Sequence, residues 1–260
     1  MIELVHAPGR VNVIGSRISD CDRDAALRLL GRAVLVGHGG YVCFSNVHTV
    51  VLGRSDPVVR AITNRSLLSL ADGKPVYWVG RKMGARRIGH VPGPDFFVEM
   101  LRLYPDAGHF FYGSSPEVLC RLTSCLEQTI PDIRICGSLS PPFRPLTDDE
   151  RLLHYRTIRD SGAAFAWIGL GAPKQERWMA DAWEHLKPCI ALGVGAAFDF
   201  SAGTVQRAPR GLGRLGLEWL YRLLQEPRRL WKRYLVSNSL FIYYLICERF
   251  RRRRCEADGT

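Results

Sequence analysis

Several signatures that would place a 260-residue chain in a narrow class are missing from this sequence. Its eight cysteines include no CxxC pair, and several lie inside apolar runs, which is typical of reduced thiols that pack as small hydrophobic side chains. The first residues show no basic stretch followed by a long apolar run, so we expect no secretory signal. Both absences favour an intracellular protein.

The sequence also lacks a run that is long and apolar enough to cross a bilayer. Its longest nearly uncharged apolar stretch is 235–247, which is shorter than the roughly 20 residues that a spanning helix needs. We therefore expect any membrane contact to be peripheral.

Metal-site signatures are missing as well. The seven histidines show neither an HExxH motif nor another paired spacing. Asp20 and Asp22 match the Asp-x-Asp pattern of metal-dependent sugar transferases, but they lie just before a predicted helix, where aspartate caps the first turn. We predict no metal site and no cofactor.

What the sequence does contain is an apolar core and an excess of positive charge. Hydrophobic residues make up 47% of the chain, and 36 Lys and Arg residues against 25 Asp and Glu residues give a net charge of +11. This charge favours anionic partners, which include phosphates, anionic lipids and nucleic acids. Charge alone does not distinguish among them.

The first two hundred residues alternate short β-type runs with helical patterns, as expected of a parallel sheet covered by helices. We predict strands at 40–44, 76–79, 109–112, 133–136, 164–168 and 189–194. We predict helices at 24–32, 57–69, 93–104, 116–127, 147–161 and 173–186. The fold class is therefore α/β, with a Rossmann-like parallel sheet.

Two polar positions follow the first part of this pattern. Ser45 and Asn46 close the strand at 40–44, and Asp72 precedes Gly73. An asparagine at the end of a strand can bind a sugar or a base, and an aspartate that projects into a cleft can act as a general base. The alternative for each is a turn, because Asn and Asp-Gly are common turn formers.

Two glycine-rich turns follow later strands. The first contains Gly169, Gly171 and Gln175, and it does not complete a GxGxxG fingerprint because Lys174 occupies the place of the third glycine. Its glycines and the following helix N-terminus would suit a phosphate or a ribose.

The second glycine-rich turn contains Gly195, and Asp199 follows it. Its small residues would let the backbone approach a nucleotide, while Asp199 could hold a hydroxyl or orient an arginine. A plain strand-to-helix turn explains the first turn equally well, and tight helix-sheet packing with a capping aspartate explains the second.

Beyond residue 206 the chain becomes rich in arginine, interleaved with leucine and aromatic residues. Arg207, Arg222, Arg229 and Lys232 belong to this segment. Guanidinium groups bind phosphate oxygens in a bidentate manner and can stabilise a leaving pyrophosphate. The alternative is a solvated face or a lipid-binding patch.

Taken together, these motifs resemble the WecG/TagA/CpsF glycosyltransferase family over about residues 11–234. The most specific parts are GLGAPKQE at 169–176, GVGAAFDF at 193–200, and the string LEWLYRL at 217–223 with EPRRL at 226–230. Several uncommon elements in one order make a coincidental match implausible.

The resemblance implies an inverting, metal-independent transferase that moves a sugar from a UDP-sugar donor to an undecaprenyl-diphosphate-linked acceptor in cell-surface polysaccharide biosynthesis. By resemblance, Asp72 is the general base. Asn46 with Ser45, and Gln175 with Gly169, Gly171, Gly195 and Asp199, form the donor and nucleotide site. Arg222, Arg229 and Lys232, with Arg207, reach the diphosphate. Two positions depart from the family pattern: Phe44 stands where threonine is frequent, and Lys232 where arginine is common.

The change in composition near Arg207 divides the chain into an α/β catalytic core at 1–206 and a basic appendage at 207–260. We expect the appendage to close the active site and to dock on the cytoplasmic face of the membrane through an interfacial helix at 235–250 and the arginines at 251–254. Self-association of the core is expected from the family.

Two alternatives come from other classes of protein. A nucleic-acid-binding protein would use the basic segment and its aromatic residues, but the glycine-rich turns would then have no role, and we expect no nucleic acid partner. A nucleotide-sugar epimerase or dehydrogenase would need a complete dinucleotide fingerprint or a Tyr/Lys pair, and neither is evident.

Overall fold

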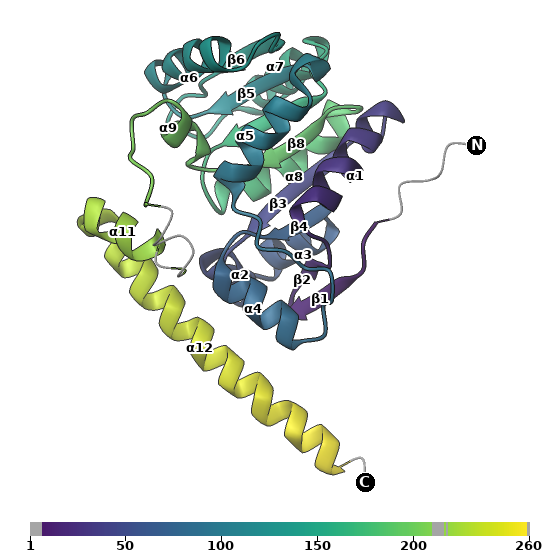
Figure 1. Ribbon diagram of the computed structural model, residues 1–260, viewed down its shortest axis with the longest axis vertical. Coiled ribbons are helices and arrows are strands. Elements are labelled where there is room, and N and C mark those ends of the chain that lie inside the picture. Colours follow the sequence, from purple (N-terminus) through teal and green to yellow (C-terminus); the bar gives the residue numbers. More distant parts are fainter. Residues whose placement is uncertain (1–6, 210–215, 217, 259–260) are drawn as a thin grey trace.

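A computed structural model describes residues 7–209, 216 and 218–258, and it describes the side chains of these residues except those of Arg229 and 252–258. Its centre is a parallel sheet of six strands in the order β4-β3-β8-β7-β5-β6 (Figure 1). The strands are β3 (Gly40–Ser45), β4 (Leu68–Ala71), β5 (His109–Gly113), β6 (Ile135–Leu139), β7 (Phe165–Gly169) and β8 (Ile190–Gly193). The predicted α/β class with a Rossmann-like sheet is confirmed.

Helices cover both faces of the sheet because strand residues alternate between two apolar clusters. Val42 and Phe44 face one cluster, whereas Tyr41 and Cys43 face the other. The first cluster is completed by α1 (Arg23–Leu35), α5 (Gly93–Leu103), α6 (Pro116–Thr129) and α9 (Ala197–Ser201). The second is completed by α3 (Pro57–Arg65), α7 (Asp148–Asp160) and α8 (Lys174–Leu186).

A third apolar cluster lies beside β4. It joins an antiparallel hairpin to two helices and to the C-terminal region. The hairpin is formed by β1 (Arg10–Val13) and β2 (Ser16–Ser19), and the two helices are α2 (Val47–Ser55) and α4 (Lys74–Lys82). A short 3-10 helix, η1 (Pro105–Ala107), precedes β5.

The predicted strand at 76–79 is wrong, because this segment lies inside α4. Its Val-Tyr-Trp-Val sequence has high strand propensity, but Pro75 stands at the start of a helix and favours helical backbone there. Of the segment, Val76 is buried and Trp78 is largely exposed, as one face of an amphipathic helix requires.

Several further elements differ from the sequence prediction. The predicted helix at 57–69 ends as α3 at Arg65, and its last residues begin β4. The hairpin at the start of the chain and α2 were not predicted. Strand β6 begins two residues later than the predicted run and extends to Leu139.

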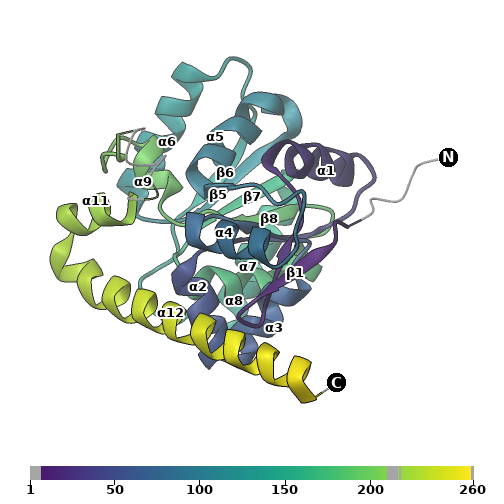
Figure 2. The same cartoon turned by 60° about the horizontal axis from the view of Figure 1, so that its bottom comes forward.

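The C-terminal region contains α11 (Glu218–Gln225) and α12 (Pro227–Asp258). Figures 1 and 2 show α12, in yellow, as a long helix that passes along α2. Among its described side chains, those of Leu230, Ser237 and Phe241 are buried, and Phe241 belongs to the third apolar cluster. The appendage therefore packs on the core; the proposed domain boundary at 206 stays a prediction.

A helix that crosses a bilayer must be about 20 residues long and mostly apolar. Within residues 7–209, 216 and 218–258, no helix combines the necessary length with sufficient apolar character.

Candidate active site

The candidate site lies where four parallel strands end. Asn46 and Asp72 follow β3 and β4, while β7 ends in Gly169 and β8 in Gly193. These strands are neighbours or near neighbours in the sheet. Parallel strands bring their carboxyl ends to one edge, which is the usual position for ligands in open α/β sheets.

Asn46 links the start of α2 to the candidate base. Its Oδ1 accepts a hydrogen bond from the Thr49 amide at 3.2 Å and thereby caps the helix. Its Nδ2 donates to Asp72 Oδ2 at 3.2 Å. Because the amide oxygen is used by the cap, the amide NH2 group faces Asp72, and this side chain orients the carboxylate.

Asp72 is held from two further directions. Its Oδ1 accepts from the Gly93 amide at 2.8 Å, at the first residue of α5, where the helix dipole favours a negative charge. His90 Nε2 donates to the carbonyl oxygen of Asp72 at 2.9 Å. Burial lowers the pKa of His90 and favours the neutral ring, in which Nε2 carries the proton that this bond donates. Sequence patterns did not predict a role for His90.

Ser45 and Phe44 belong to the interior of the sheet. The hydroxyl of Ser45 lies 2.8 Å from that of Ser69 on the neighbouring strand, and Ser45 is buried. Phe44 is also buried and packs edge-to-face on Phe96 at 5.4 Å between ring centroids. Both side chains therefore pack inside the core next to the carboxyl edge of the sheet.

Gln175 forms the floor of the second glycine-rich region. It is buried in the first turn of α8, and its Nε2 donates to the Gly193 carbonyl at 2.9 Å and to Glu176 Oε1 at 3.2 Å. A Cβ at Gly193 would lie 2.6 Å from Met179 Cε and 3.1 Å from Gln175 Nε2, so a larger residue here would require these side chains to shift. Glu176 is likewise buried, and sequence patterns did not single it out.

The other predicted glycines differ in their surroundings. A Cβ at Gly169 would meet the Phe198 ring, whereas Gly171 has a φ of +75° and open space around it. Gly195 has a φ of +56°, and an added Cβ would lie 3.6 Å from Gln175 Oε1. Gly171 and Gly195 thus present backbone to the surface in a conformation that favours glycine.

Asp199 ends the glycine-rich region. It belongs to α9 and is half-buried. Its carbonyl oxygen accepts from both the amide and the hydroxyl of Thr204, each at 3.0 Å. The backbone of Asp199 thereby turns the chain toward the appendage.

Arg207 connects the appendage to the core through carboxylates. Its guanidinium forms a bidentate ion pair with Asp95 near the start of α5, with Nη2 2.8 Å from Oδ2. Its Nε also lies 3.8 Å from Glu218 Oε1. These hydrogen bonds raise the pKa of Arg207, and the guanidinium faces protein carboxylates in this arrangement.

The appendage brings additional ionisable groups close to Asp72. Burial raises the pKa of both Glu218 and Tyr234, and the negative charge of Asp72 contributes to each shift. The guanidinium of Arg222 lies over the Phe200 ring, 5.4 Å from its centroid. Its positive charge opposes the shifts of Glu218 and Tyr234. The predicted Arg222 therefore faces α9 of the core.

Neighbouring basic residues of α12 point in different directions. Lys232 is exposed, with its ammonium 5.5 Å from the centroid of the Trp231 ring, so the structure does not bring it together with Asp72. Arg233 is half-buried and acts electrostatically on Glu176 and Tyr234. The sequence alone does not distinguish the directions of these two adjacent side chains. The side chain of Arg229 lies outside the described part of the chain.

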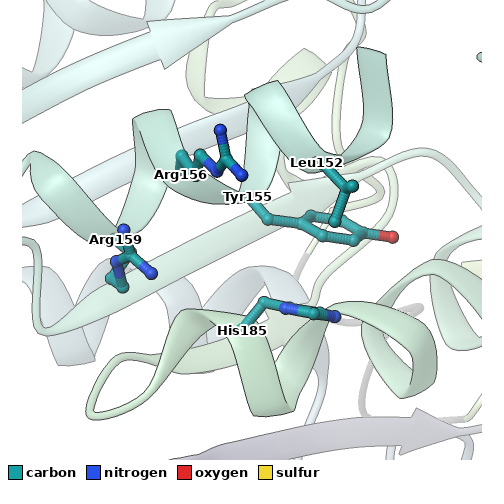
Figure 3. Close-up of a pocket in the computed structure, with 5 residues that line it drawn as sticks. All are labelled: Leu152, Tyr155, Arg156, Arg159 and His185. Carbon is teal, nitrogen blue, oxygen red and sulfur yellow. The ribbon is translucent and has the colours of Figure 1, made fainter. Parts of the chain in front are cut away.

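A separate pocket of about 210 Å³ lies between α7 and α8 (Figure 3). It is lined by Leu152, Tyr155, Arg156, Arg159 and His185, and the rings of Tyr155 and His185 stack at 5.4 Å. None of the predicted site residues lines it, and it is not at the carboxyl edge described above. We therefore place the candidate site at Asp72 and not in this pocket.

The described residues contain no group of three or more His, Cys, Asp or Glu side chains with the arrangement of a metal site. In a comparison with protein families, the model of the family described as "Glycosyl transferase WecG/TagA/CpsF family" matches residues 11–255. The match extends beyond the region expected from the sequence motifs and includes α11 and most of α12.

Proposed function

This chain belongs to the WecG/TagA/CpsF glycosyltransferase family, and from that premise we propose that it transfers a sugar from a UDP-sugar to an undecaprenyl-diphosphate-linked acceptor. The reaction serves cell-surface polysaccharide synthesis, inverts the anomeric centre and uses no metal ion. The observation that carries this proposal is the position of Asp72, a carboxylate held by Asn46 and Gly93 at the ligand-binding edge of the sheet.

Asp72 is the proposed general base. Each of its oxygens accepts one described hydrogen bond, which leaves lone pairs for the hydroxyl of the acceptor sugar. The carboxylate takes the proton of this hydroxyl while the hydroxyl oxygen attacks the anomeric carbon of the donor sugar. The bond between that carbon and UDP breaks on the opposite face. Asn46 acts by orienting the carboxylate and contacts the donor sugar from the same amide.

The leaving diphosphate is stabilised by cations of the appendage. Arg222 and Arg229 are the proposed ligands. Arg207 is paired with Asp95 in this structure, so to bind a phosphate it would exchange the carboxylate for the phosphate. Lys232 lies on the exposed side of α12 and contributes charge at longer range.

The nucleotide is proposed to lie over Gln175, with Gly169, Gly171 and Gly195 allowing close approach of its phosphates or ribose. Asp199 completes this side of the pocket. Ser45 supports the donor site indirectly, because its hydroxyl is hydrogen-bonded to that of Ser69.

The outward face of α12 is the proposed membrane contact. It exposes Leu235, Ile242, Ile246 and Phe250, which lie on the side opposite Ser237 and Phe241 by helical spacing. An amphipathic helix of this kind suits the cytoplasmic interface of the membrane, where the proposed lipid-linked acceptor would lie. The protein is therefore proposed to be peripheral, and self-association of the core is an additional proposal from the family.

A substrate panel tests the function. Purified full-length protein is mixed with each of several UDP-sugars and a lipid-diphosphate-linked acceptor, with and without EDTA, and UDP release is measured. We expect one pairing to release UDP at the same rate with EDTA, and to yield a product of inverted anomeric configuration by NMR. No release with any pairing would contradict the proposed function.

A further inference from the structure

Glu176 is a buried carboxylate that the proposed mechanism does not use. It lies in the first turn of α8 and is 2% exposed. Its Oε1 accepts from Gln175, whereas its Oε2 is buried and has no hydrogen-bond partner among the described residues. Burial raises the pKa of Glu176. A buried carboxylate of this kind is unfavourable unless a positive charge compensates it.

The cation that acts on Glu176 comes from the appendage. The charge of Arg233 opposes the effect of burial on the pKa of Glu176, and the same guanidinium contributes to the lowered pKa of His48. Arg233 is half-buried on α12, and α12 packs along α2, the helix that carries His48. One turn further along α12, Ser237 Oγ lies 3.0 Å from His48 Nδ1, which fixes this part of the helix against the core.

Glu176 also connects to the floor of the nucleotide site. Gln175 Nε2 donates to both Glu176 Oε1 and the Gly193 carbonyl, so one amide joins the carboxylate to the glycine-rich edge. A side chain that attracts Glu176 therefore acts on the same hydrogen-bond network that shapes the proposed donor site.

We propose that Glu176 is a positioning residue whose carboxylate receives the guanidinium of Arg233 and thereby seats the appendage over the donor site. The inference rests on the proposed function and deepens it. Asp72 is oriented separately by Asn46 and Gly93, so loss of this seat affects donor binding more than the chemical step.

The test compares Glu176→Gln, Arg233→Gln and the double variant in the full chain. We expect each single variant to raise the KM for the UDP-sugar about tenfold, in line with coupling energies between charged groups in contact, while kcat changes far less. The double variant should resemble the more affected single variant. Glu176→Asp keeps the charge and should recover part of the loss.

The matched control is Glu184→Gln, which removes a carboxylate from the same helix. Glu184 is exposed and pairs with Lys187, so its replacement should leave KM unchanged. Additive effects in the double variant, or an unchanged KM in Glu176→Gln, would overturn the inference. If Glu176→Gln does not fold, a comparison of Arg233→Gln with Arg233→Lys tests the proposal. The lysine variant keeps the positive charge and should have a KM for the UDP-sugar close to that of the unmodified protein. Equal KM values for the two variants would overturn the proposal.

A second measurement separates this inference from the proposed function. Hydrogen exchange of α11 and α12 reports the seating of the appendage without any turnover. We expect faster exchange in both single variants and no further increase in the double variant. If the unmodified protein turns over no UDP-sugar, the proposed function is wrong, but this exchange pattern would still support the pairing of Glu176 with Arg233. Unchanged exchange in the single variants would overturn the pairing.

Discussion

The core and the appendage hold their functional groups in different ways. At the carboxyl edge of the sheet, Asp72 is fixed by an amide side chain and a backbone N–H, and both donors belong to helix starts. In the appendage, Arg207 is paired with partly exposed carboxylates. The helix that carries Arg233 is attached through few buried side chains, among them Leu230 and Phe241.

This difference suggests a division of labour. Groups fixed by partly buried hydrogen bonds keep their geometry at no further cost when a substrate binds, as the proposed general base requires. Partly exposed ion pairs are worth little individually, and they can exchange partners when a diphosphate arrives. Chemistry in the core and charge in the appendage can therefore be disturbed separately, and the following predictions do so in order of decreasing effect.

The largest effect is expected at Asp72 in the core. Asp72→Asn removes the proton acceptor while keeping the size of the side chain, so we expect kcat to fall about 10²- to 10⁴-fold. The affinity for UDP, measured by calorimetry, should stay unchanged because the appendage is intact. Asp149→Asn, at an exposed position in the first turn of α7, serves as the control. A kcat close to that of the unmodified protein would remove Asp72 from the base role.

A smaller effect distinguishes the two faces of α12. Phe241 is 4% exposed and Phe250 is 63% exposed. Phe241→Ala should destabilise the packing of the appendage by about 3 kcal/mol, measured as faster hydrogen exchange in α12. Phe250→Ala should change stability by less than about 0.5 kcal/mol but should weaken sedimentation with anionic vesicles. The reverse pattern would mean that the outward face is not the membrane contact.

The smallest effect concerns pH. Burial is the main cause that lowers the pKa of His48 and of His109 to about 4, from an ordinary value of 6.5. Both rings are thus neutral in the folded protein, while the unfolded chain binds more protons between about pH 4 and pH 6.5. Stability should therefore be complete above about pH 6.5 and fall as the pH is lowered through this window.

Urea titrations at pH 7 and pH 5 measure this loss. His109 lies in the core, where its Nδ1 accepts from Trp167 and its Nε2 donates to the Tyr104 carbonyl, whereas His48 contacts the appendage. His48→Gln should reduce the pH dependence of hydrogen exchange in α12 and leave that of the core. Equal pH dependence of α12 with and without His48 would contradict this assignment.

The strands that could be predicted are those whose apolar residues form continuous runs. Segments 109–112 and 164–168 are buried on both faces, and the sequence pattern reflects this directly. β4 is short, and its Leu-Ser-Leu-Ala sequence has little strand propensity, so its structure depends on pairing with β3. At 76–79 the aromatic and β-branched residues were misleading, because Pro75 and the one-sided burial of α4 decide the structure.

Asn46 and Gln175 could be predicted because each follows a strand predicted from the sequence, and parallel strands bring both to one edge. The role of Asp72 came from the family resemblance, because β4 was not predicted. Groups that meet this edge from elsewhere could not be predicted. His90 depends on the loop before α5, and Glu176 on the burial of the first turn of α8. Arg233 and Lys232 are adjacent in the sequence, and only the docking of α12 distinguishes their directions.

Asn46 illustrates a constraint for anyone who wishes to alter the donor preference of this enzyme. The side chain of Asn46 both caps α2 and orients the Asp72 carboxylate. Most substitutions at this position would therefore remove the helix cap, misorient the proposed base, or do both. Lost activity there would say little about recognition of the donor. Substitutions of the residues that border the turns at Gly171 and Gly195 would leave both the α2 cap and the orientation of Asp72 intact. These positions are therefore better suited to changing the donor selectivity.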